Sequence, residues 1–291
     1  RQVTLAPSTL PPLPPTIADR LIDKQHRTVW LRGRDEHTRL HPAQAERWAD
    51  IASTITTTNN HQLRITVLGT SVTNGCGACD YTTLEAHPEF FGPEGPIKAA
   101  HNASICAARA SSVYFCDATL SWVRIMHEEL ERTFGAGRIR TRVSAKNGVG
   151  PAYFSECTES KIDADTHVIL IDVGTNLFAG SLLAMLTRIH IAAPNAAVVF
   201  VNWQFQTQCA GLAHEKSIDE AASSSYAAAA DVLSVTSILR NLMPKRFGCP
   251  MLYAVNGHDS VHPNPVGHRL IAHATATFLF DRLLHHRNSS H

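Results

Sequence analysis

The chain has 291 residues, 44% of them hydrophobic, which is enough for one α/β domain with a large core. Its 26 basic and 25 acidic residues give a formal net charge of +1, and no basic block or aromatic-basic interleave is present, so nucleic acid is not an expected partner. No apolar run approaches the roughly 18 to 20 residues that a membrane-spanning helix needs, so we expect no membrane span in this chain.

The N-terminal region is rich in proline, beginning RQVTLAPSTLPPLPPT over residues 1–16. Proline favours extended, semi-rigid backbone, so this region is predicted to be an arm or linker. We assign residues 1–40 to this arm and residues 41–291 to a single folded domain, because the first helical pattern of apolar residues covers residues 41–54.

Beyond this helix, short apolar runs alternate with helical patterns along the chain. Most of the runs lack polar alternation, which is typical of strands buried on both faces of a parallel sheet. Strands that alternate with helices predict a doubly wound, three-layer α/β/α sandwich with a roughly five-stranded parallel sheet. The predicted strands are 63–68, 139–143, 167–173, 197–202 and 251–255, and the other predicted helices are 118–134, 181–190, 218–242 and 264–284.

The cysteines bear on the compartment of the protein. Seven cysteines, together with Asn-x-Ser glycosylation sequons at Asn102 and Asn288, favour the secretory pathway or the extracellular space, where some of the cysteines would be paired. Buried free thiols and chance sequons are the alternative. Cys76 and Cys79 have zinc-ligand spacing, but no second pair follows, so a structural zinc is not expected.

Four polar fragments lie at the ends of predicted strands. In parallel α/β sheets, ligands bind beyond the carboxyl ends of the strands, so these fragments are predicted to meet in one site. They are GTSVTNG (69–75), KNGVGPAYF (146–154), DVGTN (172–176) and DSVHPNPVGH (259–268).

The residue types in these fragments match the needs of serine-based acyl transfer. Ser71 requires a neutral imidazole to accept its proton, and His262 is the candidate. Asp259, three residues earlier, can orient that imidazole within one tight turn. The Ser71 N–H, a glycine N–H from the second fragment and the Asn176 amide can donate hydrogen bonds to the oxyanion.

The order of the fragments resembles the four sequence blocks of the SGNH (GDSL-type) hydrolases, from about residue 65 to the C-terminus. The blocks read Gly69-Thr70-Ser71, Asn147-Gly148-Val149-Gly150, Gly174-Thr175-Asn176 and Asp259-Ser260-Val261-His262-Pro263.

The resemblance implies a flavodoxin-like SGNH hydrolase fold and assigns roles to individual residues. It implies Ser71 as nucleophile, Asp259 and His262 as the rest of a catalytic triad, and Gly150 and Asn176 beside the Ser71 N–H in the oxyanion hole. It also implies catalysis without a metal or an organic cofactor.

The sequence departs from the family pattern in two places. Thr70 replaces the aspartate that usually precedes the nucleophile, which is expected to change local hydrogen bonding more than reactivity. The glycine block is degenerate, so Gly148 competes with Gly150 for the oxyanion role. Thr73 stands where α/β-hydrolases have the second glycine of their nucleophile elbow, so that motif does not fit.

Three further titratable residues lie close to the blocks in sequence. His258 competes with His262 as the base, although neighbours in sequence seldom face each other. His268 is expected on the surface of the last helix. Asp172 is expected to be buried structure rather than the acid of the triad.

These patterns predict a serine ester hydrolase that acts through an acyl-serine intermediate on a small-molecule or glycan ester. The resemblance, which extends to acetylesterases, and the expected secretory setting imply the removal of small acyl groups such as acetyl from carbohydrate. The alternatives are an O-acyltransferase to a sugar hydroxyl and a catalytically silent glycan-binding module. Trp203 and Gln204, after the fourth predicted strand, could stack on or hydrogen-bond a sugar, and Trp203 could instead anchor the core. The oligomeric state is not predicted.

Overall fold

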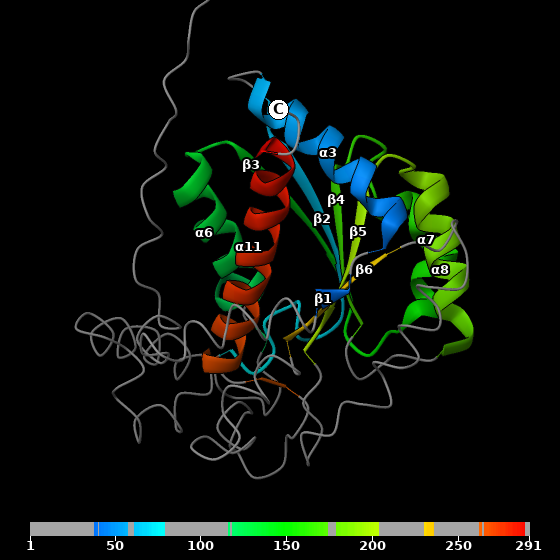
Figure 1. The fold of residues 1–291 in the computed structure, drawn as a ribbon. Coiled ribbons are helices and arrows are strands. Elements are labelled where there is room, and N and C mark those ends of the chain that lie inside the picture. Colours follow the sequence, from blue (N-terminus) through cyan, green and yellow to red (C-terminus); the bar gives the residue numbers. More distant parts are fainter. Residues whose placement is uncertain are drawn as a thin grey trace, which may run out of the picture.

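A central sheet organises the part of the chain that the computed structural model describes, namely residues 38–39, 41–57, 61–78, 116, 118–173, 179–203, 230–235, 262–263 and 265–288 (Figure 1). The sheet has six strands in the order β1-β6-β5-β4-β2-β3, and all neighbouring pairs are parallel except β1 with β6. The strands are β1 (Thr38–Arg39), β2 (Leu63–Gly69), β3 (Ile139–Ala145), β4 (Val168–Asp172), β5 (Ala197–Asn202) and β6 (Asp231–Ser234).

Helices cover both faces of this sheet (Figure 1). Helices α3, α6 and α11 enclose one hydrophobic cluster, in which Trp48 and Phe278 make an edge-to-face contact with ring centroids 6.0 Å apart. Helices α7 and α8 enclose a second cluster on the opposite face. The predicted three-layer α/β/α sandwich is therefore confirmed. The helices are α3 (Pro42–Thr57), α6 (Trp122–Phe134), α7 (Pro151–Lys161), α8 (Ala179–Ala192) and α11 (Pro265–Asn288), with a 3-10 turn at Ala118–Leu120.

The register of the sheet brings the first residues of three polar fragments to one edge. Gly69 at the end of β2 lies opposite Ala145 of β3 and Asp172 of β4. The Lys146 N–H donates to the Gly69 carbonyl oxygen at 3.0 Å, which extends this pairing past the end of the strands. The carboxyl ends of β2, β3 and β4 thus lie at the same level in the sheet.

Burial explains why these runs form strands. β4 is buried at every position, and β2 at every position except Arg64, in keeping with their largely apolar sequences in the middle of the sheet. β3 pairs with β2 and is half-exposed along most of its length. Four of the five predicted parallel strands are confirmed, and the fifth, 251–255, lies outside the described residues.

The structure corrects the predicted elements in two places. Residues 231–234 form β6, so the helix predicted over 218–242 is wrong there. The alanine-rich composition favoured a helix, but Val232 and Leu233 are buried in the clusters on opposite faces of the sheet, which is strand packing. The other correction is α7, a helix that was not predicted, although Pro151 at its first turn is a regular start signal.

One short strand lies before residue 41, the predicted start of the folded domain. This strand, β1 at residues 38–39, lies within the region assigned to the arm and pairs with β6 at the edge of the sheet. No helix in the described part of the chain combines the length and the apolar character needed to cross a bilayer.

Candidate active site

A tight turn after β2 carries Ser71. The N–H groups of Asn74, Gly75 and Cys76 donate to the carbonyls of Thr70, Val72 and Ser71 at 3.2, 2.9 and 3.0 Å. We call residues 70–76 the nucleophile turn. Within it Val72 and Thr73 are each 1% exposed and fix the turn to the core, while Ser71 remains half-buried.

The Thr73 side chain ties the nucleophile turn to the sheet. Its hydroxyl donates to Asp172 Oδ2 at 2.5 Å, across the end of β4. A Cβ at Gly69 would overlap the Thr73 side chain, so only glycine fits at the last position of β2. The packing of Thr73 therefore explains why the Gly69-Thr70-Ser71 block begins with glycine.

Asp172 is a buried carboxylate with three donors. Besides Thr73, the indole N–H of Trp122 donates to it at 3.0 Å and the indole N–H of Trp203 donates to its other oxygen. The side chain is fully buried, as expected for a structural residue. Burial raises the pKa of Asp172 to about 6, although all three hydrogen bonds favour the ionised form.

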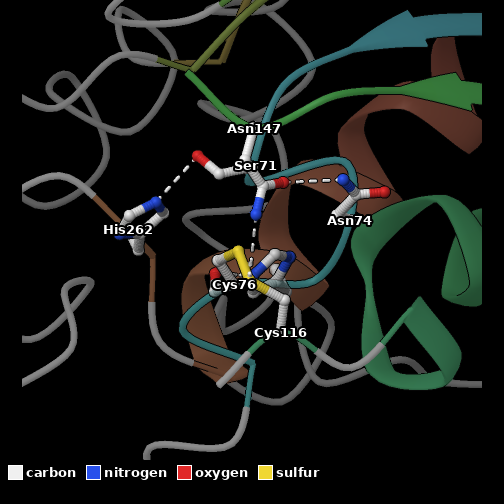
Figure 2. The surroundings of a disulfide bond; sticks show 7 residues. Ser71, Asn74, Cys76, Cys116, Asn147 and His262 are labelled. Atoms are coloured by element: carbon white, nitrogen blue, oxygen red, sulfur yellow. Dashed lines mark hydrogen bonds between the residues drawn. A yellow bond between two sulfur atoms is a disulfide. The ribbon is translucent and has the colours of Figure 1, made fainter. Parts of the chain in front are cut away.

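His262 faces the nucleophile. Its Nε2 lies 2.8 Å from Ser71 Oγ, and both side chains are half-buried (Figure 2). The two residues come from opposite ends of the domain, 191 positions apart in the sequence. A neutral imidazole that accepts at Nε2 carries its proton on Nδ1, so this nitrogen is the one that an orienting carboxylate would engage.

Asn147, from the glycine block, links the nucleophile turn to a disulfide. Asn74 Nδ2 donates to Asn147 Oδ1 at 2.7 Å, and Asn147 Nδ2 lies 3.7 Å from the Sγ of Cys116 (Figure 2). Cys116 forms a disulfide with Cys76 at the end of the nucleophile turn, where the two residues also make an antiparallel bridge. The predicted pairing of some cysteines is thus present in the structure.

His268 is a buried contact between three elements, so its predicted surface position is wrong. It lies in α11 and is fully buried because this part of the helix packs against the nucleophile turn and the start of α6. The Trp122 N–H, one of the first N–H groups of α6, donates to His268 Nδ1 at 3.2 Å. Nε2 therefore carries the proton and donates to the Cys76 carbonyl oxygen at 3.0 Å.

The ionisation state of His268 follows from this burial. Burial lowers the pKa of His268 to about 4, and the nearby His262 lowers it further, while the bond to Cys76 opposes the shift. The ring is therefore neutral at neutral pH, which is the state that both hydrogen bonds require.

The two candidate oxyanion glycines differ in conformation. Gly148 is exposed and has a φ of +72°, a left-handed conformation that favours glycine and forms the turn after β3. Gly150 is extended, half-buried and directly precedes Pro151 at the start of α7. The turn therefore explains why residue 148 is glycine. Gly150 lies at the amino end of a helix, where N–H groups favour negative charge.

The remaining predicted residues are either buried or outside the described chain. Trp203 is 1% exposed and donates to Asp172, so it leaves no face for a sugar, and the alternative of a core anchor is correct. Asn176, Gln204 and Asp259 lie outside the described residues, as does His258. Within the described chain, no group of three or more His, Cys, Asp or Glu side chains could hold a metal ion.

The comparisons with known proteins are limited. No protein-family profile and no curated protein matches this sequence. A solved structure of a family two carbohydrate esterase from Clostridium thermocellum, in complex with cellohexaose, is similar with a TM-score of 0.44 and 13% sequence identity. The similarity covers 78% of this chain and 66% of that chain, slightly less than two thirds of its length. At this level of similarity, the activity, substrate and partners of the present protein are proposals.

Proposed function

We propose that this protein is a serine ester hydrolase that acts through an acyl-serine intermediate on small acyl esters. The observation that carries the proposal is the 2.8 Å contact between Ser71 Oγ and His262 Nε2, at the carboxyl edge of a parallel sheet. A serine is inert at its free pKa, and an imidazole nitrogen at hydrogen-bond distance is the group that activates it. The order of the four sequence blocks supports the same chemistry.

In the proposed reaction, Ser71 Oγ attacks the acyl carbon while His262 Nε2 takes the hydroxyl proton. The carbonyl electron pair moves onto oxygen, where the N–H groups of Ser71 and Gly150 and the Asn176 amide are proposed to stabilise it. Collapse of this intermediate expels the alcohol, which receives the proton from His262. Water then attacks the acyl-serine by the same steps, with His262 again as base.

Asp259 is proposed to hold the imidazole during these steps. With Nε2 directed at Ser71, the Nδ1–H is the group that would donate to a carboxylate. An ionised carboxylate there fixes the tautomer and stabilises the imidazolium that forms when the serine proton is transferred.

The proposed substrate is an acetyl or similar small acyl group on a carbohydrate, as the resemblance to the SGNH hydrolases implies. Gln204 is a proposed sugar contact. Trp203 is not proposed as one, because its side chain is buried. A secretory or extracellular setting is proposed with it. The Cys76–Cys116 disulfide supports this setting, because disulfides persist mainly in oxidising compartments.

The test is labelling with a fluorophosphonate probe, followed by peptide mapping. We expect the probe on the peptide that contains Ser71, and no labelling of Ser71→Ala, which should fold normally because the serine side chain is half-buried and small. A labelled Ser71→Ala variant, or a wild-type protein that stays unlabelled, would contradict the proposal. Product analysis with and without an acceptor sugar then separates hydrolysis from transfer to a sugar hydroxyl.

A further inference from the structure

The two residues Cys76 and Gly77, which we call the Cys76–Gly77 turn, lie between the nucleophile and the segment that carries His262. We infer that this turn positions His262 against Ser71, and that Gly77 is a positioning residue for the reaction. The inference rests on the proposed function, because it concerns the distance between the two reacting side chains.

Gly77 is in close contact with the backbone of the His262 segment. Its φ is +84°, and a Cβ built there would overlap the Pro263 carbonyl oxygen and lie 3.0 Å from His262 Cβ. The overlapping atom is backbone, so no rotation of a side chain can relieve it. Any side chain at residue 77 must therefore displace either the turn or the His262–Pro263 backbone.

Three attachments keep the turn from moving. The Cys76 N–H donates to the Ser71 carbonyl oxygen at 3.0 Å, and the Cys76 carbonyl oxygen accepts from buried His268 at 3.0 Å. The Cys76 side chain is held by the disulfide to Cys116, beside Asn147 (Figure 2).

With the turn fixed, the His262–Pro263 backbone is the side that gives way. The same two residues thus hold the nucleophile on one side, through the bond to Ser71, and support the base on the other side. The 2.8 Å distance between Ser71 Oγ and His262 Nε2 depends on how closely residue 77 approaches Pro263. Glycine at this position allows the approach.

The chain offers a matched control at Gly137, in the loop between α6 and β3. Its φ is +75°, close to that of Gly77, but a Cβ there would meet no atom within 4 Å. Alanine at either position adds the same kind of backbone strain. Only alanine at 77 also adds an overlap with the His262 segment.

The experiment compares Gly77→Ala with Gly137→Ala in the hydrolysis of an aryl acetate, together with the rate of fluorophosphonate labelling. Because a misplacement of reacting groups by about 1 Å costs on the order of 100-fold, we expect Gly77→Ala to lose about 100-fold in kcat and in labelling rate, with little change in KM. Gly137→Ala should keep wild-type kinetics, although its melting temperature falls. Equal kinetics for the two variants would overturn the inference.

A second variant covers the case in which Gly77→Ala does not fold. The double variant Cys76→Ala and Cys116→Ala removes the covalent attachment of the turn without adding an atom. It also spares any other disulfide that a reductant would break. We expect at least a 10-fold loss of labelling rate, and unchanged labelling would overturn the inference. An unlabelled wild-type protein instead contradicts the proposed function itself, so the two failures are distinguishable.

Discussion

Two buried aspartates at different places in the sheet both accept hydrogen bonds from tryptophan side chains. Asp172, the last residue of β4, accepts hydrogen bonds from the indoles of Trp122 and Trp203, and Asp231, the first residue of β6, accepts one from the indole of Trp48 at 2.7 Å. Burial raises the pKa of both carboxyls to about 6. Each aspartate therefore joins a strand to one or two tryptophans of the core by charge-assisted hydrogen bonds.

Their remaining partners differ. The second donor to Asp231 is the backbone N–H of His41, at 2.8 Å, just before α3. The additional donor to Asp172 is Thr73, two residues after Ser71. The same chemistry thus anchors a helix in one place and the nucleophile turn in the other, and we expect only Asp172 to affect the reaction as well as stability.

The largest effect is expected at Asn176, four residues beyond Asp172. If its amide donates to the oxyanion, Asn176→Ala should lower kcat by about 100- to 1,000-fold with a smaller change in KM. Asn176→Asp should be at least as damaging, because an ionised carboxylate opposes the oxyanion. Measurement of kcat, KM and melting temperature decides the role. An active but unstable Asp variant would show that Asn176 only forms a turn.

Both aspartates should make the stability of the folded protein depend on pH. Their pKa values are about 6 in the folded protein against 3.8 for an ordinary aspartate side chain, so between these pH values the folded state holds more protons. Stability contributed by each neutral carboxyl is therefore lost as pH rises from about 4 to 6, by at most about 3 kcal/mol. His268, with its lowered pKa, acts in the opposite direction.

The contribution of each aspartate to this pH dependence is measured by comparing the wild type with a variant that lacks the carboxyl group. The free energy of unfolding is measured at several pH values for the wild type, Asp172→Asn and Asp231→Asn. The difference between the wild type and each variant should fall between pH 4 and 6. A difference that rises over this range would show that the folded state favours the ionised carboxylate.

The two asparagine variants separate stability from activity. Each substitution replaces one acceptor oxygen by a donor and leaves a buried donor unsatisfied, so each should lose about 1 to 3 kcal/mol of stability. Asp172→Asn should also lower kcat, by about 10-fold, because the nucleophile turn loses its anchor. Asp231→Asn, assayed well below its melting temperature, should keep the wild-type kcat. Equal activity of both variants would remove the distinction between the two sites.

The smallest effect concerns Thr73 alone. Thr73→Val removes the hydroxyl that reaches Asp172 but keeps the shape of the side chain, so stability should fall by about 1 kcal/mol and kcat by a few-fold. Thr73→Ser keeps the donor and should restore kcat. A serine variant as slow as the valine variant would show that packing, not the hydrogen bond, matters at this position.

The sequence allowed the sheet to be predicted better than the contacts that support the site. Largely apolar runs identify β2, β4 and β5, because strands buried on both faces need few polar positions. The alanine-rich composition around β6 predicts a helix instead. β6 forms a strand because it pairs with β5, which local composition does not reveal.

Among the site residues, Ser71 and His262 were predicted by their order at strand ends, and the structure brings these side chains together. The burial of His268 and the contact of Gly77 with Pro263 could not be predicted in the same way. Both depend on how residues 70–77 approach α11 and the two residues His262 and Pro263 before it, and residues so far apart in the sequence leave no local pattern. The positive φ of Gly77 likewise needs the folded backbone to be seen.

The most direct test of Ser71 as the nucleophile is to trap the acyl-enzyme. An aryl acetate is mixed with the protein, the reaction is quenched with acid at the end of the burst of aryl alcohol, and the peptides are mapped by mass spectrometry. We predict one acetyl group on the peptide that contains Ser71, in an amount that matches the burst, and none in His262→Ala. A burst with the acetyl group on another residue, or turnover that persists in Ser71→Ala at the wild-type rate, would contradict it.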